Sequence, residues 1–193
     1  MRVITGSARG RRLKELEGME TRPTTDRVKE GLFSILQFEI EGRRVLDLFA
    51  GTGQLGIECL SRGAASAVFV DRRADAVKLI RENLAATCLQ ERARVVAGDS
   101  VEYLNSLNSL HEKFDLIFLD PPYAAGLLEP AAAQIARFDI LRPHGIMVAE
   151  HPSEKAPAPL APPYRIYRTY RYGKIGLTVY RRDANQENEE QRS

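Results

Sequence analysis

The sequence contains only two cysteines, no tryptophan and no apolar run long enough to span a membrane. Two cysteines without CxxC spacing form neither a disulfide framework nor a cysteine-rich metal site, so we expect Cys59 and Cys88 to be small core residues. The amino terminus lacks the apolar segment of a signal peptide, and a membrane helix needs about 20 apolar residues. These absences predict a cytoplasmic protein with no membrane association.

Histidine is also scarce, since the chain has three. His111, His144 and His151 lack the spacing of metal ligands, so the sequence predicts no metal site. The chain has 193 residues, of which 44% are hydrophobic and 28% charged, and this composition is typical of one globular domain. A chain of this length buries about 70% of its unfolded surface, so it needs no covalent or metal reinforcement.

The net charge of +2 hides two basic ends. Residues 1–14 contain five basic and no acidic side chains, and residues 164–182 contain six basic and no acidic ones. The segment between them is acidic overall. A polyanion such as a nucleic acid is therefore expected to contact the two ends of the chain rather than its middle.

The chain is expected to have three segments. Residues 1–22 are predicted to form a basic β-ribbon extension that contacts a nucleic acid, residues 23–182 one α/β domain, and residues 183–193 a polar, disordered tail. At the start of the domain, Thr24 or Thr25 is expected to cap a helix. The apolar residues Val28, Leu32, Ile35 and Leu36 of this helix recur at helical spacing and form one face.

From residue 44 onward, short apolar runs alternate with longer amphipathic ones. The alternation predicts five strands, in VLDLF, AVFVD, ARVVAG, DLIFLD and GIMVAE, with helices over residues 53–62, 74–86, 101–110 and 127–138. This order is typical of a doubly wound, mostly parallel sheet covered on both faces. Residues 152–163 hold five of the ten prolines and predict an extended connector. The runs around Gly173-Lys174 predict a closing antiparallel hairpin.

A glycine loop follows the first predicted strand. Gly51, Gly53 and Gly56 have the GxGxxG spacing, and Asp71 ends the next strand, where its carboxylate can accept both ribose hydroxyls of a nucleoside cofactor. The loop alone does not separate NAD from S-adenosylmethionine. The carboxylate of Asp47 favours a cofactor with an ammonium and a sulfonium over an anionic pyrophosphate.

Two further aspartates end predicted strands. Asp99, after the third strand, can accept from an adenine amino group or cap the next helix, and these roles are compatible. Asp120-Pro121-Pro122-Tyr123 follows the fourth strand. Its prolines remove two N–H donors, which leaves only acceptors, the carboxylate and a proline carbonyl.

Such a site suits an exocyclic amine. Two acceptors that hold the amine hydrogens can turn the nitrogen lone pair toward a methyl donor, and the Asp120 carboxylate can help to remove the proton. The ring of Tyr123 offers a face for stacking a base. Guanine, with donors at N1 and N2, suits the site somewhat better than adenine or cytosine, but these residues alone leave the choice open.

These motifs together resemble one family. VITGSARGRRL, RPTTDRVKEGLFSIL, VLDLFAGTGQLGIECLSRGA, FVD and DLIFLDPPY, between residues 2 and 123, are similar to the bacterial ribosomal RNA small subunit methyltransferase D family, the 16S rRNA (guanine(966)-N2)-methyltransferases. The resemblance implies a Rossmann-like class I methyltransferase fold, S-adenosylmethionine as cofactor, a monomer, and one guanine of 16S rRNA in a small subunit or assembly intermediate as substrate. The implied cofactor residues are Asp47, Gly51, Gly53, Asp71 and Asp99, and the implied catalytic motif is Asp120, Pro121, Pro122 and Tyr123.

The first helix and the basic ends supply further candidates. Thr24, Asp26 and Arg27 are expected to close over the cofactor or a phosphate, with plain helix capping as the alternative. RNA phosphates are expected to contact the basic arm at Arg2, Arg9, Arg11 and Arg12, and Arg27 beside it, unless the arm is only solubilising. Four hairpin tyrosines either stack on RNA bases or face the core, namely Tyr164, Tyr167, Tyr170 and Tyr172.

Other functions stay open. A DNA adenine or cytosine amino-methyltransferase shares the glycine loop and DPPY, but usually needs a target-recognition region for which little chain remains. A protein glutamine methyltransferase would leave the basic ends unexplained. A non-catalytic RNA-binding assembly factor with this fold would tolerate loss of Asp120, and an NAD oxidoreductase would need an acid/base pair that is not evident.

Overall fold

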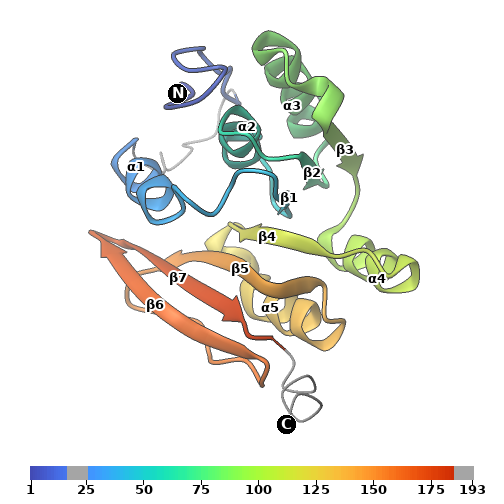
Figure 1. Ribbon diagram of the computed structural model, residues 1–193, viewed down its shortest axis with the longest axis vertical. Coiled ribbons are helices and arrows are strands. Elements are labelled where there is room, and N and C mark those ends of the chain that lie inside the picture. The colour runs from blue at the N-terminus through green and yellow to red at the C-terminus, as the bar shows by residue number, and fades with distance from the viewer. Residues whose placement is uncertain (17–25, 185–193) are drawn as a thin grey trace, which may run out of the picture.

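The computed structural model describes residues 1–16 and 26–184 (Figure 1). The helices are α1 (Asp26–Ile35), α2 (Gln54–Ser61), α3 (Ala74–Thr87), α4 (Ser100–Leu110) and α5 (Leu128–Arg137), with short 3-10 turns at Gln90–Arg92 and Tyr123–Ala125. The strands are β1 (Arg44–Asp47), β2 (Ser66–Asp71), β3 (Ala93–Ala97), β4 (Phe114–Leu119), β5 (Leu141–Pro152), β6 (Tyr164–Tyr172) and β7 (Ile175–Arg182).

The strands form one seven-stranded sheet in the order β3-β2-β1-β4-β5-β7-β6. All pairs from β3 to β5 are parallel, whereas β7 runs antiparallel to both β5 and β6. The order reverses between β1 and β4, and in sheets of this kind ligands bind outside the carboxyl ends of the strands at that point. The predicted doubly wound sheet with an antiparallel hairpin at its end is confirmed.

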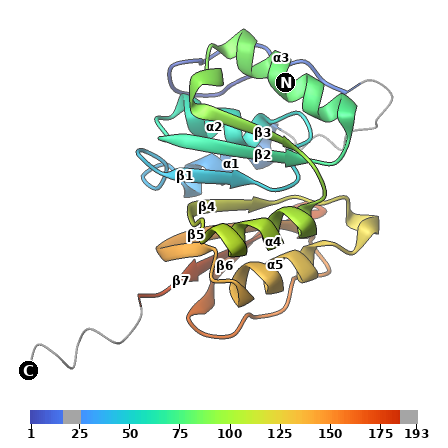
Figure 2. The same ribbon diagram turned by 90° about the vertical axis from the view of Figure 1, so that its right-hand side faces the viewer.

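Helices cover both faces of the sheet. One buried apolar cluster joins the sheet to α1, α2 and α3, through residues such as Leu32, Leu55 and Ile80. The other joins it to α4 and α5, which lie side by side on the opposite face in Figure 2, through residues such as Leu104 and Ile135. Because β1, β2 and β4 are buried on both faces, their sequences are almost continuously apolar rather than alternating.

The first 16 residues pack along α2 and α3, at the edge of the molecule opposite the β6–β7 hairpin (Figure 1). They contain a single bridge, between Arg2 and Arg12, instead of two full strands. The reason lies in the polar partners of the segment, since the N–H groups of Ile4 and Thr5 donate to the carboxylate of Glu58 on α2. The Thr5 N–H, which bonds to α2, is therefore not available to extend the pairing of Val3 with residues 10 and 11.

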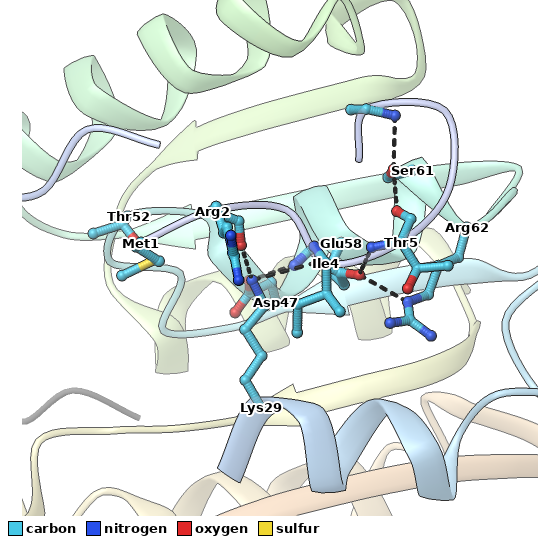
Figure 3. A network of polar contacts seen from close by, with 12 residues as sticks. Met1, Arg2, Ile4, Thr5, Lys29, Asp47, Thr52, Glu58, Ser61 and Arg62 are labelled. Carbon is cyan, nitrogen blue, oxygen red and sulfur yellow. Dashed lines mark hydrogen bonds and ion pairs between the residues drawn. The ribbon is translucent and has the colours of Figure 1, made fainter. Parts of the chain in front are cut away.

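A buried ion pair fixes this segment to the domain. Lys29 of α1 lies 3.3 Å from the carboxylate of Glu58, both side chains are fully buried, and the Lys29 ammonium donates to the carbonyl of Arg2 at 2.8 Å. Arg62 adds a second charged contact to Glu58 at 2.9 Å. Figure 3 shows Lys29 reaching from α1 to the same carboxylate that holds Ile4 and Thr5. We call Lys29, Glu58 and Arg62 the arm clamp.

Several sequence predictions need correction here. Cys59 is buried as predicted, but Cys88 is exposed at the end of α3, where its φ of 59° closes the helix with a left-handed residue. β5 begins at Leu141, earlier than the predicted run GIMVAE, because the strand continues through an irregularity opposite Phe114 and Leu116.

Within the described residues, no helix is long and apolar enough to cross a membrane.

The hairpin tyrosines divide between the two predicted roles. Tyr164 is buried and Tyr170 and Tyr172 pack against the core, so these three stabilise the sheet. Tyr167 is 51% exposed, and the guanidinium groups of Arg165 and Arg181 lie 5.9 and 4.9 Å from its ring centre. Only Tyr167 therefore offers most of its surface to a partner.

Candidate functional site

Acidic side chains lie at or near the carboxyl ends of five neighbouring strands. Asp99, Asp71, Asp47, Asp120 and Glu150 come from β3, β2, β1, β4 and β5, in the spatial order of the sheet. All five line one cavity of about 820 Å³, together with the glycine loop, Arg72, Arg73 and the arm residues Met1, Glu15 and Leu16. A pocket of this size can enclose a nucleoside-sized ligand, and its acidic wall suits a cationic one.

The glycine loop has the geometry that its spacing predicts. Gly53 has a φ of 78° and offers no side chain to cap α2, and among the first N–H groups of α2 that of Gly56 donates to the carboxylate of Asp47. A side chain at Gly56 would meet the ring of Phe69 at 2.3 Å, so this glycine allows α2 to pack closely on β2. The loop therefore brings the α2 amino terminus against the carboxyl end of β1.

Asp71 braces the glycine loop. One of its carboxylate oxygens accepts from the N–H of Gly51 and the other from the N–H of Arg73, both at 2.9 Å. A carboxylate has about four acceptor positions, so these two bonds leave capacity for ligand hydroxyls. The structure thus places Gly51, Gly53 and Asp71 together, as the sequence predicts.

Asp47 is buried at the floor of the cavity. It is 2% exposed and accepts a hydrogen bond from the N–H of Gly56 at 3.1 Å. Burial raises its pKa to about 7, opposed by the Gly56 hydrogen bond and reinforced by the negative charge of Asp71. The ionised form of Asp47 is therefore unfavourable in the protein without ligand, and a bound cationic ligand would stabilise it.

We expect Asp47→Asn to stabilise the protein without ligand above pH 7. The folded pKa of about 7 exceeds the ordinary value of 3.8, so stability falls as pH rises between these values. The loss is at most about 4 kcal/mol above pH 7. The amide oxygen of asparagine can still accept from Gly56, so only the charge is removed.

The measurement is thermal unfolding of both proteins at pH 5 and pH 8. The variant should have the higher Tm at pH 8, with a smaller difference at pH 5, and a weaker affinity for a cationic cofactor. An unchanged or lower Tm of the variant at pH 8 would contradict a strained Asp47 carboxylate.

Asp99 performs the capping role that the sequence left open. Its carboxylate accepts from the N–H groups of Val101 at 2.8 Å and Glu102 at 3.4 Å, at the start of α4. It also lines the cavity. Capping fixes the side chain at the cavity edge, so the two predicted roles remain compatible.

Asp120, Pro121, Pro122 and Tyr123 form a second part of the cavity wall, at the end of β4 next to β1. Burial and the negative charges of Glu150 and Asp47 raise the pKa of Asp120 well above its ordinary value. The Tyr123 hydroxyl donates to Glu150 at 3.0 Å. Pro121 is buried and Pro122 exposed, so the backbone here is fixed and supplies carbonyl groups without N–H donors. This arrangement can bind an NH₂ group and accept a proton from it.

The basic arm does not bring its arginines to this cavity. Arg9 and Arg11 lie on the turn beside Ser61, the last residue of α2, and Arg11 donates to the carbonyl of Ala86 near the end of α3. Both helices begin at the cavity edge, so the turn is at least one α2 length away, about 12 Å. Arg2 and Arg12 are exposed nearer the cavity, and Arg27 is exposed in the first turn of α1.

Some predictions fall outside the described residues. These are Thr24, the side chain of Asp26 and the tail beyond Ala184. Among the residues that the structure describes, no group of three or more His, Cys, Asp and Glu side chains is arranged to hold a metal ion.

The sequence patterns do not mark several polar side chains that line the cavity, namely Glu15, Thr52, Gln54, Arg72, Arg73, Ser100 and Glu150. Glu150 ends the apolar run GIMVAE, and an acid at the end of such a run is the same signal that identifies Asp71 and Asp120, although β5 itself continues to Pro152. Gln54 was not singled out. Its side-chain oxygen is buried without a hydrogen-bond partner at the cavity, and no sequence pattern marks such an atom.

Known proteins match this chain over nearly its whole length. Residues 1–181 match the family described as "Conserved hypothetical protein 95". The chain is 40% identical over 182 residues to "Putative rRNA methyltransferase YlbH" of Bacillus subtilis, covering 94% of this chain and 99% of that protein. It is 34% identical over 190 residues to "Ribosomal RNA small subunit methyltransferase D" of Escherichia coli, covering 98% and 93%.

Solved structures share the overall fold of this chain. "Putative methyltransferase yhhF from Escherichia coli" superimposes with a TM-score of 0.83 at 32% identity, over 96% of this chain and 99% of that chain. A structure described as a putative RNA methyltransferase from Pyrococcus horikoshii shares the fold at 17% identity, with a TM-score of 0.66 over 90% and 95% of the chains. The fold is therefore that of the class I methyltransferases.

Proposed function

The chain belongs to the ribosomal RNA small subunit methyltransferase D family, and on this premise we propose that it transfers a methyl group from S-adenosylmethionine to the N2 amine of a guanine in 16S rRNA. The observation that carries the proposal is the acceptor-rich wall at Asp120 to Tyr123, which lines one acidic cavity together with the glycine loop. The loop can hold the donor while the wall holds the acceptor amine.

The cavity residues fit S-adenosylmethionine. Its ammonium group would meet Asp47 and the buried, unpartnered side-chain oxygen of Gln54, and its ribose hydroxyls would meet Asp71. Asp99 is placed to accept from the adenine amine. A pyrophosphate would instead enter a cavity lined by six carboxylates, so the charges favour this cofactor over NAD.

The chain itself supplies position and a proton acceptor. When bound, S-adenosylmethionine supplies a methyl carbon activated by a positively charged sulfur. Asp120 and a proline carbonyl hold the hydrogens of the target amine, so its lone pair turns out of conjugation with the ring. Asp120 then accepts one amine proton, which is effective because its raised pKa makes it a stronger base than an ordinary aspartate. Tyr123 supports the face of the flipped base.

The number of acceptors favours guanine. Guanine presents donors at both N1 and N2 on one edge, whereas adenine and cytosine each present a donor beside an acceptor. The wall holds the Asp120 carboxylate and the Pro121 carbonyl, since the Pro122 carbonyl accepts from the Ala125 N–H, and Glu150 adds a further carboxylate to the same cavity. An acceptor-rich wall leaves the ring acceptor of adenine or cytosine facing another acceptor, which is unfavourable.

The arm is expected to contact RNA phosphates away from the cavity. Arg9 is exposed on the turn remote from the site, so Arg9→Ala should weaken RNA binding without changing cofactor affinity. The slope of log affinity against log salt concentration should fall by about one. Arg137→Ala, which removes an exposed arginine from α5 on the opposite face, should leave the slope unchanged. If both substitutions lower the salt slope of RNA binding equally, or if neither changes it, RNA does not bind specifically along the arm.

The substrate class is tested by offering labelled S-adenosylmethionine with four acceptors in parallel. These are small subunits from cells that lack the gene, naked 16S rRNA, duplex DNA and total protein. The proposal predicts label in the first or in both rRNA samples. Label in DNA or protein would replace the rRNA assignment, and cofactor binding without transfer to any acceptor would favour a non-catalytic assembly factor.

A further inference from the structure

Glu150 lies beside the catalytic motif but belongs to a different strand. The register between β4 and β5 pairs Leu119 with Ala149, and continued by one residue it places Asp120 next to Glu150. Adjacent strands are about 4.8 Å apart. Both carboxylates line the cavity, and the negative charge of Glu150 acts directly on Asp120.

Glu150 also determines where Tyr123 lies. The Tyr123 hydroxyl donates to the Glu150 carboxylate at 3.0 Å. Tyr123 belongs to a short 3-10 turn, Tyr123–Ala125, whose neighbouring residues are mostly exposed, so packing alone holds it weakly. A hydrogen bond to a charged group on a central strand is stronger than one between neutral groups, and it can fix the ring.

Apolar side chains surround the two carboxylates on the side away from the large cavity. The small space behind them is lined by Leu32 of α1, Leu55 of α2, Leu177 of β7, and Phe118, Leu119 and Val148 of the central strands. The nearest buried cation, Lys29 of α1, is paired with Glu58. In the large cavity the other charged groups are Asp47, Asp71, Asp99, Glu15, Arg72, Arg73 and the amino group of Met1, which is paired with Glu15.

We propose that Glu150 is a positioning residue of the methyl-transfer site, which holds the Tyr123 ring through its hydroxyl and places a second negative charge beside Asp120. This inference rests on the proposed function. Two like charges in an apolar surrounding hold a proton between them more tightly than one carboxylate does. Asp120 therefore takes the amine proton as the N–CH₃ bond forms and the CH₃–S bond breaks, with the bonding electrons of the latter going to sulfur.

Two substitutions separate the two effects. Glu150→Gln keeps an oxygen that accepts from Tyr123 but removes the charge, whereas Tyr123→Phe removes the hydrogen bond and leaves the charge. For Glu150→Gln we expect the pKa of Asp120 to fall by about one unit or more. The acid limb of the kcat profile should move down by the same amount, and kcat at its plateau should fall about tenfold, with little change in KM for RNA. For Tyr123→Phe we expect KM for RNA to rise about tenfold, with the acid limb unmoved.

The pKa of Asp120 is measured by carbon NMR of labelled aspartate in the protein alone, with Asp120→Asn to assign the signal. This readout needs neither RNA nor turnover. An unchanged Asp120 titration in Glu150→Gln would overturn the inference, and so would an equal rise in KM for RNA in both variants. If the Asp120 titration moves as expected while the product is not N2-methylguanosine, the assignment of guanine as the substrate is wrong, and the electrostatic role of Glu150 is still supported.

Discussion

Asp120→Asn is expected to reduce kcat for methyl transfer by about 10²- to 10⁴-fold, the usual contribution of a general base. Asparagine has nearly the same shape and keeps one acceptor oxygen, so the target amine can still bind. It cannot take the amine proton. The buried surroundings of Asp120 and the adjacent charge of Glu150 raise its pKa well above the ordinary value, and that proton affinity disappears with the carboxylate.

Cofactor affinity separates this loss from a loss of structure. S-adenosylhomocysteine binding, measured by calorimetry, should be within a few-fold of the wild-type value, because the expected contacts of the cofactor lie at Asp47, Asp71 and Asp99. The wild-type kcat should itself fall as pH decreases through the raised pKa of Asp120, since only the ionised form accepts a proton. If the kcat of Asp120→Asn equals that of the wild-type protein, Asp120 is not the general base.

Glu58→Ala is expected to lower the free energy of unfolding by about 3–5 kcal/mol, the usual effect of removing one partner of a buried ion pair. The change leaves the Lys29 ammonium buried without its carboxylate. It also removes the acceptor for the N–H groups of Ile4 and Thr5. Because single domains are stable by only about 5–15 kcal/mol, this loss brings the protein near unfolding.

Lys29→Met is the matched control for the arm clamp. It removes the buried cation while keeping a similar volume, and Glu58 retains Arg62 and the two backbone donors. We expect a smaller loss, about 1–2 kcal/mol. Urea unfolding at pH 7 measures both variants. A larger loss for Lys29→Met than for Glu58→Ala would contradict the view that the carboxylate organises the clamp.

The arm clamp also links stability to the site. Met1, Glu15 and Leu16 form part of the cavity wall, and the arm that carries them is held through Glu58. Lys14 and Asn83 fix the same arm to α3 through a hydrogen bond from the Lys14 N–H to the Asn83 side chain at 2.8 Å. Loosening the clamp is therefore expected to weaken cofactor binding as well.

The sequence predicts those parts of the molecule that depend on local pattern. Short apolar runs between amphipathic segments identify the strands, and helical spacing identifies α2 to α5 to within about two residues at either end. The glycine spacing places the loop between β1 and α2. The acids at the ends of β1 and β2 are recognisable because their position on a parallel sheet is fixed by the strand itself. For the same reason the position of Asp120 at the end of β4 is enough to assign it to the cavity.

Features that depend on contacts between distant segments were not predictable. The Lys29–Glu58 pair joins α1 to α2, and neither residue stands out, since Lys29 lies beside the apolar stripe of α1 and Glu58 in an ordinary helix. Glu150 and Tyr123 meet only because β5 lies next to β4. Cys88 was wrongly assigned to the core, because helical pattern does not reveal that the helix ends there in a left-handed residue.

The proposed function depends on an acceptor-rich wall at Asp120 to Tyr123 that directs methyl transfer to the N2 of guanine. The measurement is mass spectrometry of the nucleosides from small subunits that lack this methylation, after incubation with S-adenosylmethionine and either the wild-type protein or Asp120→Asn. The account predicts N2-methylguanosine with the wild-type protein and almost none with the variant. Methyladenosine or methylcytidine in its place would contradict the guanine assignment, and equal N2-methylguanosine from both proteins would contradict the role of Asp120.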